Sequence, residues 1–152
     1  MGTDSRQSQP GDLFFALPGE SYDGHGFLAE VAHKGAAAVV VERDKLPAQP
    51  LNCAVIVVEK TREALGRLAA FYRAQFRLMV VAVAGSNGKT TTKELLAAVL
   101  RQQLSTLWSE ASFNNEIGVP LTLLRLEREH EAAVLEVGTN HPGELAPLIR
   151  MI

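Results

Sequence analysis

A run of glycine, lysine and threonine residues carries the strongest chemical signal in the sequence. It follows an apolar segment and precedes a segment with helical spacing. Glycines at such a turn let successive backbone N–H groups point inward, which creates an anion site at the positive end of a helix. Lys89 would then reach the β- and γ-phosphates of a nucleotide, and the hydroxyl of Thr90 can ligate Mg²⁺. The residues predicted to bind the nucleotide are Gly85, Ser86, Asn87, Gly88, Lys89, Thr90 and Thr91.

The sequence over residues 83–90 matches the general phosphate-loop motif only in part. The strict motif requires a glycine at the position that Val83 occupies here. The alternative is a glycine turn between a strand and a helix, followed by an exposed lysine. We favour the phosphate loop, because the glycines, the lysine, the two hydroxyls and both flanking elements would otherwise have to coincide.

Four further polar residues follow in the second half of the chain. Glu136 ends an apolar strand, where a carboxylate would stand beside the phosphate loop and hold Mg²⁺ directly or through water. His141 lies in the loop that follows on the same side of the sheet. Asn114 and Asn115 precede a helix, where asparagine can cap the helix or contact a ligand. A solvated strand end and an exposed loop histidine are the plainer alternatives for Glu136 and His141.

Two polar clusters occupy the first part of the chain. Asp4-Ser5-Arg6 stands before a short apolar strand, and Asp23-Gly24-His25-Gly26-Phe27 stands after it. Serine and arginine beside a glycine-rich helix start can bind a diphosphate. The alternative for Asp23 is that it simply caps a helix.

From residue 78 onward the chain alternates strand and helix. Buried strands are expected over 78–84 and 132–137, with a short strand at 105–108. Helices are expected over 90–103, 117–126 and 144–152, with Pro120 in a first turn where its missing N–H is tolerated. This alternation predicts an α/β fold in which helices cover a parallel sheet.

The first part of the chain predicts a separate small α/β unit. Strands are expected over 13–17, 36–41 and 54–58, the last two β-branched-rich and typical of strands buried on both faces. Helices are expected over 27–34 and 61–77. We therefore predict one domain over residues 1–77 and a second over 78–152.

Composition excludes several classes of protein. With 152 residues, the chain makes about one ordinary domain or two small ones. Its 15 Lys+Arg and 17 Asp+Glu give a net charge of −2, so nucleic acid is not the expected partner. The longest apolar runs are far shorter than the roughly 18 residues of a membrane helix. The single cysteine, Cys53, cannot form an internal disulfide, which favours a cytoplasmic setting.

The ends of the sequence suggest a piece of a longer protein. The chain opens on functional-looking polar residues and ends on a helix that has no strand to return to. A three-stranded parallel sheet from residue 78 would leave apolar edge surface uncovered. We therefore expect further residues at both ends.

The quoted motifs resemble those of the Mur ligase family. Gly85 to Thr91 is similar to the family's ATP loop, which lacks the first glycine of the strict motif, as Val83 does here. The segments 4–6, 10–17 and 23–27 resemble the uridine-nucleotide-binding domain of the branch that extends the muropeptide. The segments 114–120 and 136–144 resemble the member that adds D-alanyl-D-alanine.

The resemblance implies a three-domain cytoplasmic ligase, of which this chain would hold most of the first domain and about half of the second. It implies ATP-dependent joining of D-alanyl-D-alanine to UDP-N-acetylmuramoyl-tripeptide in peptidoglycan precursor synthesis. The reaction would pass through an acyl phosphate and then a tetrahedral intermediate. The fragment alone is expected to be inactive, because a carbamylated lysine, the adenine contacts and the amino-acid domain would lie beyond Ile152.

The resemblance also assigns roles to single residues. Thr90 and Glu136 would hold the first Mg²⁺, and His141 would help to hold a second ion near the acyl phosphate. Lys89 and Asn115 would lie near the γ-phosphate, with Lys89, Asn115 and His141 as the catalytic set. The residues implied to contact the uridine diphosphate are Ser5, Arg6, Asp23, Gly24 and His25.

Other functions stay open at this point. The chain could belong to a sister ligase that adds lysine or diaminopimelate, or to a non-catalytic nucleotide-binding module. A GTPase is disfavoured, because no Asn-Lys-x-Asp signature follows the loop. The sequence does not indicate an oligomeric state or the third residue of the acceptor peptide.

Overall fold

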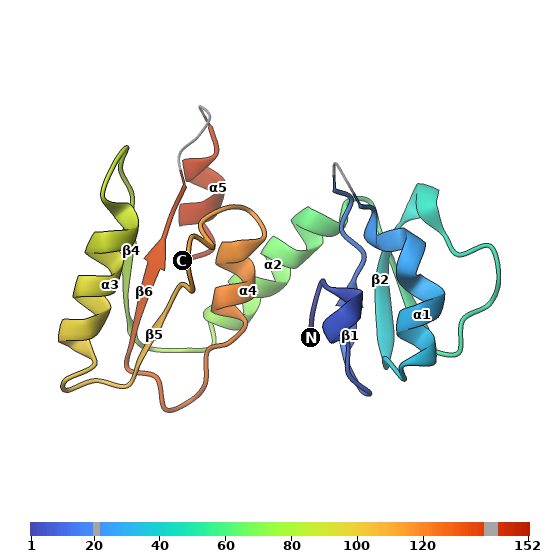
Figure 1. Ribbon diagram of the computed structural model, residues 1–152, viewed down its shortest axis with the longest axis horizontal. Helices are drawn as coiled ribbons and strands as arrows, with labels where there is room; N and C mark the ends of the chain where they lie inside the picture. Colours follow the sequence, from blue (N-terminus) through green and yellow to red (C-terminus); the bar gives the residue numbers. More distant parts are fainter. Residues whose placement is uncertain (20–21, 139–142) are drawn as a thin grey trace. The chain divides into compact units, whose positions relative to one another are not determined.

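The computed structural model describes residues 1–19, 22–138 and 143–152, and it divides into two compact units, Met1–Leu65 and Gly66–Ile152 (Figure 1). The division falls within helix α2 (Thr61–Arg73). The sequence instead predicts a domain boundary after residue 77, and that boundary stays a prediction.

The first unit is a three-stranded parallel sheet in the order β1-β2-β3, covered by one short helix. The core joins the helix to β1 and β2 through residues such as Phe14, Val31 and Val39, all nearly inaccessible to solvent. Short 3-10 helices precede or follow the strands. The elements of this unit are η1 (Ser5–Gln7), β1 (Leu13–Phe15), η2 (Gly24–Phe27), α1 (Leu28–His33), β2 (Ala38–Glu42), η3 (Arg43–Lys45) and β3 (Ala54–Val58).

The prediction that residues 54–58 form a strand is confirmed, but the prediction that this strand is buried on both faces is wrong. Val55, Ile56 and Val57 are 37–45% exposed. β3 lies at an edge of the sheet, but its edge position alone does not account for this exposure, because Phe14 and Phe15 of the other edge strand, β1, are buried. A β-branched-rich sequence does not distinguish a central strand from an edge strand.

The second unit is also a three-stranded parallel sheet, in the order β4-β6-β5. The predicted α/β fold is confirmed in both units, but the prediction that the strand over 78–84 is buried is wrong, because no residue of the observed strand is buried and Met79 is 47% exposed. The elements of this unit, besides the later part of α2, are β4 (Met79–Val83), α3 (Lys89–Leu100), β5 (Thr106–Trp108), α4 (Gly118–Leu123), β6 (Ala132–Glu136) and α5 (Leu145–Ile149).

Residue alternation along β6 sends its side chains to opposite faces of the sheet. Ala133 and Leu135 face a core shared with α2, α4 and α5. Glu136 points to the other face, where its carboxylate meets Thr90 of α3. Figure 1 shows α3 and α4 on opposite sides of this sheet.

The register of the strands determines which loops meet at the carboxyl edge. Val83 at the end of β4 pairs with Glu136 at the end of β6. Trp108 at the end of β5 pairs with Val134, so that Ser109 also comes level with the end of β6. The loops that follow β4, β5 and β6 therefore gather at one edge, the usual ligand-binding edge of open parallel sheets.

Over the described parts of the chain, no helix combines the length and the apolar composition that crossing a membrane requires.

Candidate functional site

The loop between β4 and α3 has the backbone shape that its glycines predict. Gly85 adopts φ 149° and Gly88 adopts φ 74°, conformations that residues with a Cβ rarely adopt. A Cβ at Gly88 would meet no atom within 4 Å, so the backbone angle and not space requires glycine there. Lys89, the first residue of α3, donates from Nζ to the carbonyl oxygen of Gly85 at 2.9 Å. The ammonium group thus lies over the loop that the sequence predicts to hold phosphates.

Glu136 is the centre of the polar cluster at this edge. Its side chain is 1% exposed and is held from both sides. Thr90 Oγ1 donates to Oε2 at 2.8 Å, and Asn114 Nδ2 donates to Oε1 at 2.8 Å. The alternative of a solvated strand-end glutamate is therefore wrong.

The backbone around Glu136 is hydrogen-bonded to the loop between β5 and α4. Its N–H donates to Ser109 Oγ at 3.1 Å. The N–H of Gly138 donates to the carbonyl of Asn114 at 2.6 Å. A Cβ at Gly138 would approach Asn114 Oδ1 at 3.0 Å and its carbonyl oxygen at 3.1 Å, so only glycine leaves Asn114 in place.

The donor set at this edge fits Mg²⁺. A hydroxyl and a carboxylate are hard oxygen ligands, and Mg²⁺ commonly takes one or two carboxylates together with phosphate oxygens and water. Within residues 1–19, 22–138 and 143–152, no group of three or more His, Cys, Asp and Glu gathers in a way that would hold a metal alone. A site formed by Thr90 and Glu136 would accordingly need a nucleotide to complete the coordination.

Asn115 takes a different position from its neighbour Asn114. Its Oδ1 accepts the N–H groups of Ile117 and Gly118 at 3.1 and 2.9 Å, so it caps the start of α4. It also lines a pocket of about 430 Å³ together with Gly138 and Leu148. The capping alternative thus describes its side chain here, and a contact with a γ-phosphate stays a prediction.

His141 lies outside the described residues, and its predicted catalytic and metal-binding roles stay predictions.

In the first unit, three of the predicted substrate-binding residues line one pocket. Ser5, Arg6 and Gly24 border a cavity of about 470 Å³ whose apolar wall includes Phe14 and Phe27. Gly24 is required there by space, because a Cβ would come within 2.8 Å of the backbone nitrogen of Leu17. A lining of both polar and apolar side chains suits a ligand that has both a ring and charged groups.

Arg6 is exposed at the rim of this pocket and is paired with Asp4. Its NH2 group lies 2.7 Å from Asp4 Oδ2, and its backbone N–H also donates to Asp4. These hydrogen bonds from Arg6 lower the pKa of Asp4 to about 2. The guanidinium of Arg6 is therefore already paired with the ionised carboxylate of Asp4 at neutral pH.

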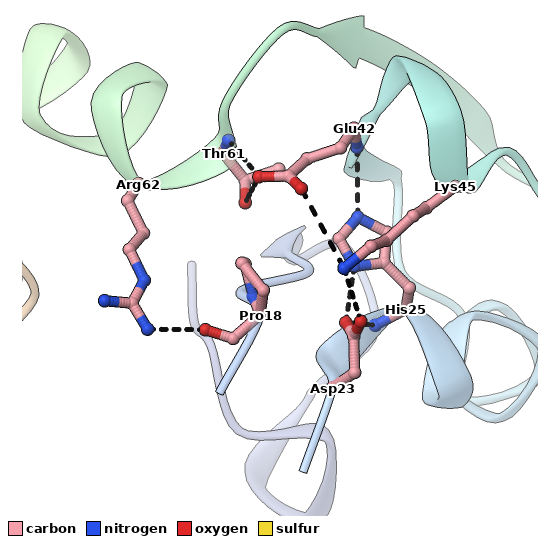
Figure 2. A network of polar contacts seen from close by, with 7 residues as sticks. All are labelled: Pro18, Asp23, His25, Glu42, Lys45, Thr61 and Arg62. Atoms are coloured by element: carbon pink, nitrogen blue, oxygen red, sulfur yellow. Dashed lines mark hydrogen bonds and ion pairs between the residues drawn. The ribbon is translucent and has the colours of Figure 1, made fainter. Parts of the chain in front are cut away.

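Asp23 and His25 belong to a network of polar contacts within the first unit (Figure 2). Neither residue is among those that line the pocket. His25 Nε2 accepts the backbone N–H of Glu42 at 3.0 Å, so its Nδ1 carries the proton and donates to Asp23 Oδ1 at 2.6 Å. Lys45 Nζ donates to Asp23 Oδ2 at 2.6 Å. Glu42 in turn accepts from the N–H of Thr61 at 3.1 Å.

This network ties η2, η3, the end of β2 and the start of α2 to one another. Burial would raise the pKa of Asp23, but hydrogen bonds from Lys45 and from the backbone and ring of His25 hold it well below the usual value. The same pairing raises the pKa of Lys45. Asp23 also accepts the N–H of His25, so the capping alternative for Asp23 is correct in this structure.

Sequence reasoning missed two residues of the site. Lys93 is completely buried in α3, and Ser109 is buried after β5. A lysine inside a helix and a serine after a strand are usually solvated, so neither has a signal of its own. The one sequence signal for Lys93 is its position in the predicted helix that begins at the phosphate loop.

Comparisons with protein-family models match most of the chain. Residues 1–73 match a model described as "Mur ligase family, catalytic domain", and residues 83–152 match one described as "Mur ligase middle domain". The two matches cover the two stretches in which the motifs were found.

Whole-chain comparisons find relatives with the name of one kind of ligase. The chain is 47% identical over 146 residues to a UDP-N-acetylmuramoyl-tripeptide--D-alanyl-D-alanine ligase of Escherichia coli, covering 95% of the chain and 31% of the relative. Identity is 42% to the ligase of the same name from Bacillus subtilis, covering 99% of the chain and 33% of the relative. The chain thus spans about a third of the length of these relatives.

Solved structures agree in fold. A crystal structure of MurF from Acinetobacter baumannii superimposes with a TM-score of 0.91 at 43% identity, over 99% of this chain and 32% of that one. MurF of Thermotoga maritima, solved in complex with ADP, gives a TM-score of 0.88 at 35% identity, over 99% and 34%.

Proposed function

Since the chain belongs to the Mur ligase family, we propose that the protein carrying it joins D-alanyl-D-alanine to UDP-N-acetylmuramoyl-tripeptide at the expense of ATP. The acceptor and the dipeptide are taken from the names of the relatives, which share 42–47% identity with the chain in the two cases above. The reaction would supply a peptidoglycan precursor in the cytoplasm.

The observation that carries this proposal is the convergence of the phosphate loop and Glu136 at one edge of the second sheet. Thr90 and Glu136 are joined by a hydrogen bond of 2.8 Å, although they lie on different elements. A positive loop and a fixed carboxylate beside it are the parts that binding of a metal–triphosphate complex requires.

In this proposal the backbone N–H groups of residues 85–91 surround the phosphates, and Lys89 leaves the Gly85 carbonyl to pair with them. Mg²⁺, when bound, neutralises the charge that develops on the transferred phosphoryl group. Thr90 and Glu136 would hold it, with Asn114 orienting the carboxylate. We keep Asn115 and His141 as candidates for contacts to the γ-phosphate and to a second ion.

The chemistry has two steps. A carboxylate oxygen of the peptide attacks the γ-phosphorus and ADP leaves, which gives an acyl phosphate. The amine of D-alanyl-D-alanine then attacks the acyl carbon, loses a proton and expels inorganic phosphate. Both steps depend mainly on positioning and charge neutralisation, which the residues at the sheet edge would supply.

We propose that the first unit binds the UDP portion of the substrate. Ser5, Arg6 and Gly24 line the pocket of about 470 Å³, and Asp23 and His25 hold η2, which forms one of its walls. In the same scheme the substrate domain spans residues 1–77 and the nucleotide domain starts at residue 78. The two family models leave residues 74–82 unmatched, and the proposed boundary lies there.

The test is phosphate release by the full-length protein with ATP, UDP-N-acetylmuramoyl-tripeptide and an amine acceptor. D-Alanyl-D-alanine, lysine and diaminopimelate are offered in turn. We expect release with the dipeptide only. Release with a single amino acid would assign the protein to a sister ligase, and no release with any acceptor would favour a non-catalytic module.

A further inference from the structure

Lys93 places a buried ammonium group in the second unit, and the proposed reaction gives this group no role. It lies one helical turn after Lys89 in α3, and its side chain is 0% exposed. Lysine is almost never fully buried unless its ammonium group is paired. Every N–H of this ammonium has an acceptor within reach, because Nζ lies 2.7 Å from Ser109 O, 2.8 Å from Ala111 O and 2.8 Å from Glu94 Oε1.

Two of these acceptors belong to the loop between β5 and α4. Ala111 in this loop has φ 46°, the one positive φ among non-glycine residues in the described part of the chain. A Cβ disfavours that conformation, so the loop needs an outside contact to keep it. The Lys93 ammonium supplies that contact at the carbonyl of the strained residue itself.

The same loop supports Glu136 at two points. Ser109 Oγ accepts the N–H of Glu136, and Asn114 Nδ2 donates to its Oε1. Lys93 therefore fixes the backbone at Ser109, which supplies one contact to Glu136, and at Ala111, three residues before Asn114, which supplies the other. These contacts connect Lys93 of α3 to the loop between β5 and α4, and that loop to the carboxylate of Glu136. The carboxylate in turn accepts a hydrogen bond from Thr90, which is also in α3.

We infer that Lys93 is a positioning residue for the metal site: its ammonium anchors the 109–111 backbone and so keeps Asn114 in contact with Glu136 and the carboxylate of Glu136 oriented toward Thr90. This inference rests on the proposed function, since it assumes that Thr90 and Glu136 hold Mg²⁺ with a bound nucleotide. It predicts that Lys93 affects the contribution of Mg²⁺ to nucleotide affinity and leaves the binding of metal-free nucleotide unchanged.

The experiment measures ADP binding to the full-length protein by calorimetry, with Mg²⁺ and with a chelator. Lys93→Met removes the ammonium and replaces the apolar part of the side chain with one of similar length. We expect it to reduce the enhancement of ADP affinity by Mg²⁺ about tenfold, the effect typical of residues that orient metal ligands. The affinity for ADP in the presence of the chelator should not change.

Two comparisons separate positioning from general stability. Tyr72→Phe removes another hydrogen bond from a side chain to a backbone carbonyl in this unit, that of Leu126, away from the sheet edge. It should lower the melting temperature and leave the Mg²⁺ effect unchanged. In a double-mutant cycle, Asn114→Ala should add little to Lys93→Met, because both act on the orientation of Glu136.

If the Lys93→Met protein fails to fold, the same binding measurements on Lys93→Arg test the inference. Arginine is longer than lysine, and no single guanidinium nitrogen carries three N–H groups, so it cannot reproduce all three contacts of the Lys93 ammonium; we expect a loss of about threefold in the Mg²⁺ effect. An unchanged Mg²⁺ effect in whichever variant folds overturns the inference, as does full additivity with Asn114→Ala. If the wild-type protein itself shows no Mg²⁺-dependent ADP binding, the proposed function fails and this inference fails with it.

Discussion

The hydroxyl of Thr90 donates a hydrogen bond of 2.8 Å to the carboxylate of Glu136, a residue 46 positions later in the chain. The pairing of Val83 with Glu136 in neighbouring parallel strands makes this contact possible, because it brings the ends of β4 and β6 level. One edge of the sheet thereby carries a positive loop and a buried acid side by side.

Lys89→Ala should abolish ATP-dependent phosphate release by the full-length protein and leave its fold intact. Within the described residues, the Lys89 ammonium makes one hydrogen bond, to the Gly85 carbonyl, so its loss removes little of the folded structure. We expect at least about a 100-fold loss of turnover, the scale for removing one group that stabilises transition-state charge. Lys60→Ala is the control, since the Lys60 side chain is 70% exposed. Turnover retained in Lys89→Ala would contradict the role given to this lysine.

Glu136→Gln should weaken the dependence of nucleotide binding on Mg²⁺. The amide keeps the volume of the buried side chain but removes the charge that attracts the ion. We expect at least about a tenfold higher Mg²⁺ concentration at half-saturation, measured by titrating Mg²⁺ at fixed ADP. Glu131→Gln is the matched control, because Glu131 lies next to the opposite end of β6 and is exposed. Equal Mg²⁺ requirements in the two variants would mean that Glu136 has no part in holding the ion.

Gly138→Ala should disturb Asn114 directly. The added Cβ would lie 3.0 Å from Asn114 Oδ1, too close for an ordinary contact. We expect a destabilisation of about 1–3 kcal/mol from overpacking, measured by denaturant unfolding. Gly2→Ala serves for comparison, because a Cβ there meets no atom within 4 Å. A Gly138→Ala protein as stable as Gly2→Ala would show that Asn114 is not held as tightly as its contacts indicate.

Asp23→Asn should change the response of the protein to acid. The folded state holds the pKa of Asp23 below its usual value, so its stabilising contribution is complete above the unfolded pKa of about 3.9. It is lost as the pH falls below that value through the folded pKa. We therefore expect the difference in free energy of unfolding between wild type and Asp23→Asn to be largest near neutral pH and to shrink below pH ~4. A difference that grows toward low pH would contradict this ionisation.

The sequence predicted the elements well, because their signals are local. Strand 54–58 and the glycine turn at residues 85–88 have hydrophobic runs and turn residues that identify them without tertiary information. The exposure of β3 is not predictable from its residues, since it depends on which other parts of the chain cover the strand. Burial is a tertiary property that a run of valines does not encode.

The site was predictable in part. Residues of the phosphate loop are consecutive, so their spacing alone indicates a phosphate-binding function. The roles of Asn114 and Asn115 were not separable, because adjacent asparagines differ only in the direction of their side chains. His25 was assigned to a ligand, although its two ring nitrogens both have protein partners. Such partners come from residues distant in sequence, and no local pattern reveals them.

The most direct test of the account is to locate bound metal–nucleotide on the molecule. Mn²⁺ replaces Mg²⁺ at sites with oxygen ligands, and its unpaired electrons broaden the NMR signals of nearby amides. With Mn²⁺ and ADP added to the protein, we predict selective broadening at residues 85–91, at Asn114 and at Glu136. Binding of ADP with broadening elsewhere, or with these amides unaffected, would contradict the claim that the loop and the acid form one site.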